Sequence, residues 1–281
     1  MLKCELILLA ACTIFAGCTR NGKVLGVDEA KYVGYSKQAN EKAREQRLGI
    51  GMEIADGELF VPGVYVPDGS VIRRRIKCTM AELEARVRNT ISSRRIDCAI
   101  APVAVFTHGQ VRFGQVAAVF DLCNGLGFNV FGFCSMAERP PIACVPGPIV
   151  LPLIGNGVAF EANAKYGNCV EVKIDAGGHI VVDGSVVLDG NDVREDSSVL
   201  KKHLLARFPE WCDSEKCGQV VCLIFADKDV HVEHVDHAAT ATMLAGCSFV
   251  AMVGVCKDGC KYMRFTTPVP DATYWNYGEA W

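Results

Sequence analysis

The chain has 281 residues and a formal net charge of −3. Half of the residues are hydrophobic and 22% are charged, which excludes an intrinsically disordered protein because such chains are poor in apolar residues. The sequence has neither a basic patch nor a run rich in Lys and Arg, and this argues against a nucleic-acid-binding protein.

The N-terminus has a basic start at Lys3 and an apolar stretch over residues 6–16. The stretch has the length of a signal-peptide core and is shorter than the roughly 20 apolar residues that span a bilayer. It ends in Phe15-Ala16-Gly17-Cys18, which resembles a bacterial lipobox. The resemblance implies that residues 1–17 are removed, that Cys18 carries lipid, and that the protein faces the periplasm, on the outer membrane rather than the inner one because of Thr19. An ordinary secretory signal with a chance cysteine is the alternative.

Residues 18–48 are polar and charged, and we expect a tether. A first module is predicted over residues 49–134. Asp56-Gly57 between alternating apolar residues predicts a hairpin. Thr79 with Glu82 predicts a capping box at the start of a helix over 81–93. A strand over 96–105, a helix within 111–127 and a strand over 130–134 complete this module.

Residues 135–157 contain five prolines and predict an extended linker. A second module is expected over residues 158–256, with a hairpin around Gly177-Gly178, a turn at Asp183-Gly184 and a helix over 198–208. Its last part is a strand–helix–strand unit. The runs 220–226 and 249–255 are apolar and rich in β-branched residues, and between them an amphipathic helix ends at Gly246. Residues 257–281 form an aromatic tail.

The two modules repeat the same order of elements, which indicates a tandem duplication. Gly57 corresponds to Gly178 at an offset of 121, and Val111, Val116 and Gly127 correspond to residues 119 positions later. Cys98 is aligned with Cys222 at an offset of 124. The predicted fold is α+β, with two small ββαβαβ modules, each a mixed sheet covered by two helices.

The second module resembles the periplasmic domain of the ExbD/TolR family of biopolymer-transport proteins. The resemblance depends on two segments, IDAGGHIVVDG at residues 174–184 and IFADKDV at residues 224–230, and on the following helix and Gly246. The first module matches at VRFGQV, residues 111–116, and at Gly127-Phe128. It departs where the offset of 124 places Val103 and Val105 against Asp227 and Asp229.

The resemblance implies a partner-binding component of an energy-coupled transport or envelope-linking assembly, with Asp227, Lys228 and Asp229 in partner binding. Expected partners are envelope proteins of an ExbB/TolQ-like or TonB/TolA-like system, or peptidoglycan, and a homodimer is left open. Family members conduct protons through an acidic transmembrane helix, which the sequence does not contain, so we expect another chain to conduct them. A disulfide-stiffened structural lipoprotein and an unrecognised periplasmic enzyme are the alternatives.

Three histidines, His231, His234 and His237, form the densest polar cluster together with nearby acidic residues. Helical residues are 100° apart, so His231 and His237 would point about 120° apart and the three rings would not converge on a metal ion. We therefore predict a solvated helix face. Asp175, Asp183 and Asp227 are predicted to stabilise turns. No hydrolase, P-loop or dinucleotide motif occurs, so neither catalytic residues nor a cofactor is predicted.

The chain contains 15 cysteines, and an oxidising compartment permits disulfides. Cys212 and Cys217 flank one polar loop, and Cys256 and Cys260 flank a turn; each pair is a candidate local bridge, with a zinc site as the alternative. Four others lie in apolar runs and are expected to be small buried hydrophobic residues: Cys98, Cys123, Cys222 and Cys247.

Overall fold

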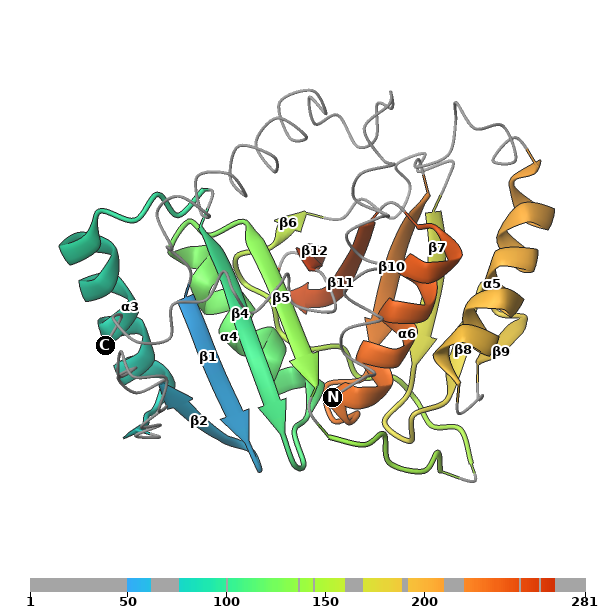
Figure 1. Cartoon of the computed structure of the whole chain (residues 1–281), viewed down its shortest axis with the longest axis horizontal. Helices are drawn as coiled ribbons and strands as arrows, with labels where there is room; N and C mark the ends of the chain where they lie inside the picture. The colour runs from blue at the N-terminus through green and yellow to red at the C-terminus, as the bar shows by residue number, and fades with distance from the viewer. Residues whose placement is uncertain are drawn as a thin grey trace, which may run out of the picture.

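The computed structural model describes residues 50–61, 76–99, 101–135, 137–143, 145–159, 169–188, 192–209, 220–247, 249–257 and 259–265. In these residues the chain forms one sheet of five strands and one of seven, with helices α4 and α6 in the middle of the molecule and α3 and α5 at opposite ends (Figure 1). This is the predicted α+β class, with two tandem sheet-plus-helix modules.

The first module has the strand order β3-β2-β1-β4-β5, in which β1, β4 and β5 are parallel and β2 and β3 are antiparallel additions. Its elements are β1 (Ile50–Ala55), β2 (Glu58–Val61), β3 (Ile76–Lys77), α3 (Met80–Arg94), β4 (Pro102–His108), α4 (Phe113–Gly125) and β5 (Val130–Ser135).

Local sequence explains where these elements begin and end. Asp56 and Gly57 both have positive φ, at 48° and 79°, and so form the two-residue turn between β1 and β2 that matches strand twist. Thr79 accepts a hydrogen bond from Glu82 N, and Glu82 in return accepts one from Thr79 N, which confirms the capping box of α3. Strand β4 begins later than predicted because Ala101 N bonds to Asp97 O and closes a turn first.

The second module repeats this order as β9-β8-β7-β10-β11 and extends it with β12 and β6. Its elements are β6 (Val158–Ala159), β7 (Cys169–Ile174), β8 (Ile180–Val182), β9 (Val186–Leu188), α5 (Val193–Arg207), β10 (Val221–Ala226), α6 (Val232–Ala245), β11 (Phe249–Cys256) and β12 (Gly259–Phe265). The predicted strand–helix–strand unit is therefore present, and Gly246 caps α6 at φ 110°. Helix α5 begins earlier than predicted because Asp192 caps it.

Strand register aligns the two copies residue by residue. Ile50 pairs with Val103 in the first module, and Val170 pairs with Cys222 in the second. The equivalent of Cys222 is therefore Val103 at an offset of 119, and the alignment of Cys222 with Cys98 is wrong. Residues 106–108 are the last three residues of β4.

The helices of both modules cover one continuous hydrophobic core. Buried side chains such as Phe120 and Phe133 of the first module belong to the same apolar cluster as Ile224 and Val235 of the second. A smaller cluster on the other face of the second sheet contains Leu223 and Val253. Because the main core is shared, the two modules form one body.

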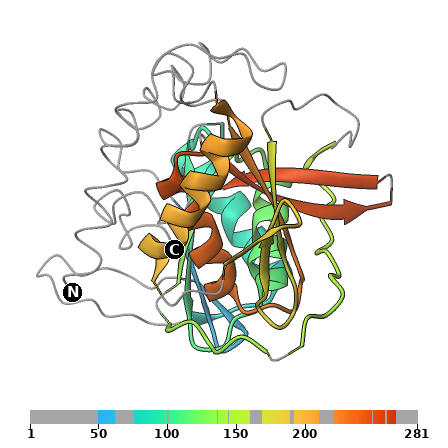
Figure 2. The same cartoon turned by 90° about the vertical axis from the view of Figure 1, so that its right-hand side faces the viewer.

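The linker lies against the second module and does not act as a spacer. It follows that module's lower edge and then passes behind its sheet (Figures 1 and 2). Ile154 N donates to Val255 O, and Ile154 is fully buried above Gly254, where a Cβ would lie 2.4 Å from its Cδ1. The first residues of the predicted tail form β12, which pairs with β11 in a ribbon that projects from the body (Figure 2).

Candidate functional site

The two modules meet where helices α4 and α6 begin. The segments before these helices run antiparallel, with a β-bridge between Arg112 and His231. Phe113 N, which follows Arg112, donates to Val230 O at 2.9 Å, and Val232 N, which follows His231, donates to Val111 O at 3.0 Å. All these positions are related by the offset of 119, so the junction has the approximate two-fold symmetry of an isologous dimer interface.

Further hydrogen bonds fix the junction on the side of the first module. Gly114 N donates to Lys228 O at 2.8 Å, and Arg112 Nη1 donates to Asp229 O at 2.8 Å. A Cβ at Gly114 would lie 2.9 Å from Lys228 O, closer than side chains approach backbone. Close contact between the modules therefore requires glycine at this position.

The residue equivalent to Gly114 in the second module is Glu233, which is 4% exposed. Its Oε1 accepts a hydrogen bond from Ser135 Oγ at 2.9 Å, and its Oε2 has no hydrogen-bond partner in the described residues. Burial raises the pKa of the Glu233 carboxyl, and the Ser135 hydrogen bond offsets only part of that effect. A buried carboxylate at an interface, whose second oxygen makes no hydrogen bond to a described residue and lies 3.9 Å from His231 Nδ1, is a functional candidate, because burial that raises a pKa often marks functional sites.

The structure places the three predicted partner-binding residues at this junction, in the turn after β10. The carboxylate of Asp227 is 2% exposed and accepts hydrogen bonds from Val150 N at 2.6 Å and Asp229 N at 2.7 Å. The Asp227 carboxylate therefore binds backbone amides of its own chain, as expected of a residue that stabilises a turn. Lys228 and Asp229 are exposed and lie 3.5 Å apart as an ion pair, and their role in partner binding stays a prediction.

Two aspartates at the ends of parallel strands hold the linker. Asp175, after β7, accepts from Gly147 N at 2.7 Å, and Asp227, after β10, accepts from Val150 N. Burial alone would raise the pKa of Asp175, but hydrogen bonds from the amides of Gly147 and His179 and the nearby His179 ring outweigh it and hold this pKa below its ordinary value. Asp175 therefore holds the linker as a charged carboxylate.

The prediction of a solvated face over His231–His237 is wrong. His234 is 2% exposed and packs against Gly178, while His237 Nε2 lies 2.5 Å from Asp196 Oδ2 of α5. The polar face is buried because α5 and the turn between β7 and β8 both pack against α6. In the described residues, which include all six histidines, no group of three or more His, Cys, Asp or Glu is arranged to hold a metal ion.

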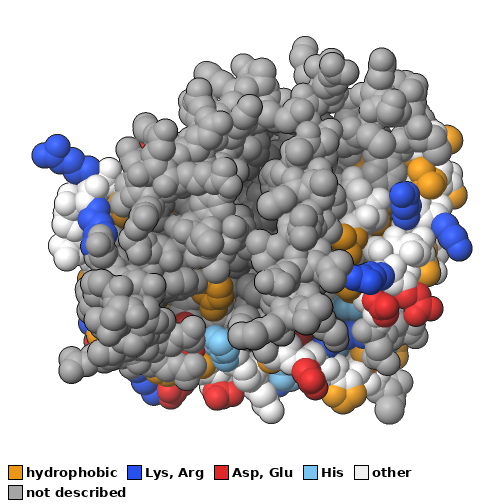
Figure 3. Space-filling model, viewed as in Figure 1, with side chains coloured by type: hydrophobic (Ala, Val, Ile, Leu, Met, Phe, Trp, Pro, Cys, Tyr) orange, Lys and Arg blue, Asp and Glu red, His pale blue; other side chains and the backbone are white. Residues whose placement is uncertain are grey.

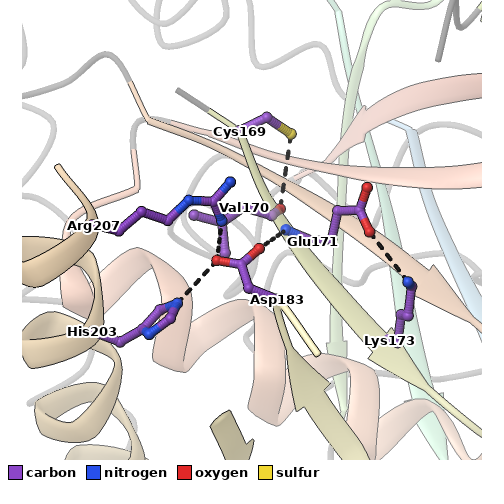
Figure 4. Close-up of polar contacts among 7 residues, drawn as sticks. All are labelled: Cys169, Val170, Glu171, Lys173, Asp183, His203 and Arg207. Carbon is purple, nitrogen blue, oxygen red and sulfur yellow. Dashed lines mark hydrogen bonds and ion pairs between the residues drawn. The ribbon is translucent and has the colours of Figure 1, made fainter. Parts of the chain in front are cut away.

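A second polar cluster joins α5 to the sheet at the outer end of the molecule (Figure 4). Asp183 accepts from Glu171 N at 3.0 Å, and its other oxygen contacts His203 Nε2 at 2.9 Å and the Arg207 guanidinium. Burial raises the pKa of Asp183, but the bonds from Arg207, His203 and Glu171 together lower it. The nearby Cys169 has its pKa raised to about 12 by burial, so the cluster contains no thiolate nucleophile and acts as a clasp between helix and sheet.

Three of the four cysteines of the apolar runs are buried as predicted, and Cys98 is not. Cys123, Cys222 and Cys247 are buried, and Cys98 is half-buried, all without a disulfide. Burial raises the pKa of Cys222 to about 12, which makes it unreactive. The predicted lipid-attachment residue Cys18 and the pair Cys212 and Cys217 lie outside the described residues. For the other candidate pair, the backbone register places Cys256 opposite Gly259 and Val255 opposite Cys260, and this bridge stays a prediction.

Sequence reasoning missed the residues that form the junction, namely Arg112, Gly114, Ser135 and Glu233. The signal was present in the offset of 119, which relates Arg112 to His231 and Gly114 to Glu233. Arg112 and Gly114 follow the carboxyl end of β4, and His231 and Glu233 follow that of β10. The carboxyl ends of parallel strands are where α/β proteins usually place binding sites. In Figure 1 the arrowheads of β1, β4 and β5 point to the lower edge of the molecule, and Figure 3 shows charged side chains of both signs, together with histidines, along that edge.

Comparison with known proteins found no match to a family model, to a curated protein or to a solved structure. The resemblance to the ExbD/TolR family therefore rests on the sequence motifs alone. In the described part of the chain, no helix combines the length and the apolar character that crossing a membrane requires.

Proposed function

We propose that this chain is a membrane-anchored, periplasm-facing partner-binding component of an ExbD/TolR-type transport or envelope-linking assembly. In this proposal it is attached to the membrane through lipid at Cys18. Proton conduction belongs to a separate membrane chain, and this chain supplies a binding surface to that chain or to peptidoglycan.

The observation that carries the proposal is the union of two modules into one body across an approximate two-fold axis. A single core and the paired segments at Arg112 and His231 hold both copies in a fixed relation. Such an arrangement presents a rigid surface, and rigidity lowers the entropy that a partner must lose on binding. The arrangement supports a binding role better than a catalytic one.

The exposed pair Lys228 and Asp229 is the surface that we assign to the partner. Their turn is held rigid because Lys228 N donates to Val150 O at 2.8 Å and Asp227 fixes the amide of Asp229. Val150 beside them is 52% exposed and adds apolar area to the charged pair. A fixed pair of opposite charges next to apolar surface favours recognition of a partner with the complementary arrangement.

A charge-swap experiment tests this assignment. The full-length chain, purified from membranes with its anchor, would be used to capture envelope proteins and peptidoglycan fragments from detergent-solubilised membranes of its host. The variant Lys228→Glu with Asp229→Lys should reduce capture at least tenfold. Lys173→Glu with Glu171→Lys is the matched control, because Lys173 and Glu171 form another exposed ion pair, at 3.2 Å, on β7.

The outcomes test the proposed partner-binding function and its assignment to Lys228 and Asp229 separately. Capture of a multi-helix membrane protein or of peptidoglycan that is lost only in the first variant supports both. Equal loss in the two variants, or loss in neither, overturns the assignment to Lys228 and Asp229. If the unchanged protein captures neither class of partner, the proposed function itself is contradicted.

A further inference from the structure

His234 lies where the linker crosses the turn between β7 and β8. Its ring packs so closely against Gly178 that a Cβ at that glycine would lie 2.5 Å from the ring Cε1 and Nε2 atoms. The side chain is 2% exposed, and Nδ1 has no hydrogen-bond partner in the part of the chain that the structure describes. The ring is therefore enclosed, and Nδ1 makes no hydrogen bond to a described group that would stabilise a second proton on it.

The linker lies over this turn through two backbone contacts. Ala143 N donates to Gly177 O at 2.9 Å, and Gly147 N donates to the carboxylate of Asp175 at 2.7 Å. The charges that face the His234 ring are unbalanced. Four groups act on it: Arg139 from the linker, His231 at the N-cap of α6, His237 from α6 and Asp175 from the turn. Only Asp175 favours a positive ring, and the other three oppose it.

We propose that His234 is an acid-sensitive latch: its neutral ring keeps the linker seated on the second module, and its protonation releases the linker. Release would expose the buried turn and free the segment that carries Val150, so the accessible surface beside Lys228 and Asp229 would change with pH. The latch depends only on the geometry of this turn and does not require the function proposed above.

The direction and size of the effect follow from the two states of the ring. Burial, followed by the charge of Arg139, lowers the pKa of His234 from 6.5 to about 4 while the linker is seated. A released ring in water would return to its ordinary pKa near 6.5. The seated state therefore has its full advantage above pH 6.5 and loses it as the pH falls toward 4. Relative to pH 7, release at pH 5 should be favoured up to about twentyfold.

Other titrating groups near the latch do not produce this pattern. The pKa of Asp175 is lowered, so this carboxylate stays charged at pH 5. Glu233 has a raised pKa and lies nearby, but its hydrogen-bond partner is Ser135, the last residue of β5, and it is unchanged in the His234 variant below. His231 and His237 have lowered pKa values and remain in every variant below, so they act as an internal reference.

The first module supplies the matched variant. Gln115 occupies the position equivalent to His234 and lies near Gly57, the equivalent of Gly178. Replacing His234→Gln therefore places in the second module a side chain that the same fold already accommodates, and that does not titrate.

Hydrogen–deuterium exchange of the peptide covering residues 139–150 measures release directly. Exchange would be followed in the intact chain at pH 7 and pH 5 and corrected for the intrinsic pH dependence of amide exchange. The unchanged protein should exchange this peptide about ten to twenty times faster at pH 5, whereas His234→Gln should change less than threefold. Peptides from the core strand β10 should stay protected in both, which distinguishes release from unfolding.

Each other outcome overturns the latch. Equal acceleration in the two proteins would assign release to another group, and no acceleration in the unchanged protein would exclude release. If His234→Gln fails to fold, NMR titration of the six imidazoles of the unchanged protein decides the matter. One ring, His234, should stay neutral to about pH 4, and a midpoint near 6.5 for every ring would contradict the proposal.

Discussion

The two modules differ in burial and in polar contacts at two equivalent positions, the second and third residues of α4 and α6. In the first module these are Gly114 and Gln115, and every polar contact is satisfied: Gln115 Nε2 donates to Gly57 O at 2.8 Å and its Oε1 accepts from Arg112 N at 3.0 Å. In the second module Glu233 and His234 occupy the same places. Each is buried, and each has one polar atom without a hydrogen-bond partner in the described residues.

The first module therefore stabilises the junction through satisfied hydrogen bonds, whereas the second module carries buried groups whose protonation depends on pH. The N-terminus of one helix is enough to hold the junction of a duplicated fold tightly. In this chain it is the N-terminus of α4 in the first module. The second copy is then free to carry buried titratable groups that lower stability but respond to their surroundings. Functional sites commonly carry such costs, which the rest of the fold offsets. The following substitutions test how far the two copies have diverged.

The largest effect is expected at Gly178. Gly178→Ala places a Cβ against the His234 ring and also forces alanine to a φ of 87°, so unfolding free energy should fall by about 2–4 kcal/mol. Gly184→Ala is the control, because its φ is 73° but nothing lies within 4 Å of the added atom, and it should cost only about 1 kcal/mol. Urea denaturation measures both. Equal losses would show that the ring contact is not tight.

The next effect tests the junction at the first module. Gly114→Ala should lower the unfolding free energy by about 1–3 kcal/mol, because the added Cβ meets the backbone carbonyl of Lys228. Gly125→Ala in the same helix is the comparison, since its Cβ would meet only the movable side chain of Asn156. Thermal unfolding of both variants should separate them, with Gly125→Ala close to the unchanged protein. A neutral Gly114→Ala would mean that the modules do not approach so closely in solution.

Placing a histidine at the equivalent position of the first module, the reverse of His234→Gln, should have a smaller effect on stability. Gln115→His removes the hydrogen bonds to Gly57 O and from Arg112 N, and should cost about 1 kcal/mol. Acid sensitivity should stay slight, because Gln115 is only half-buried. Unfolding free energies measured from pH 7 to pH 4 would check this, and a steep loss below pH 6.5 would contradict it.

The smallest expected change is an increase in the unfolding free energy. The pKa of Glu233 is raised by burial, so its carboxylate destabilises the folded state at pH 7 and this cost disappears as the pH falls to the ordinary glutamate value. Glu233→Gln should therefore raise the unfolding free energy by up to about 1 kcal/mol at pH 7 and have little effect near pH 4. Denaturation curves at the two pH values measure this, and a loss of stability at pH 7 would show that the carboxylate is better satisfied than its contacts indicate.

Local patterns predicted the elements, because turns and caps are determined by neighbouring residues. Asp56-Gly57, the Thr79 capping box and the Gly246 cap are each set within a few positions. The alignment of Cys98 with Cys222 failed because two identical residues were matched without strand register, and register is fixed only by pairing across the sheet.

The candidate site could be predicted only in part. A helix considered alone places His234 and Glu233 on a polar face, and polar faces are usually solvated. Here α5, the linker and the first module all cover α6, and these contacts come from segments that are distant in sequence, such as Ser135, which lies 98 residues from Glu233. The burial of these side chains is therefore a property of the duplicated pair rather than of either sequence segment.

The pairing of β6 with β12 has a consequence for synthesis of the chain. Ala159 and Lys261 are neighbours in the second sheet, although one precedes nearly all of its strands and the other follows them. At translation rates of about 5–20 residues per second, the early strand waits roughly 5–20 seconds for its partner. The first sheet contains only strands that are made before the linker, so it can be complete while the second is still being synthesised. The first sheet can thus be complete on the nascent chain before the second sheet forms and packs against it to complete the shared core.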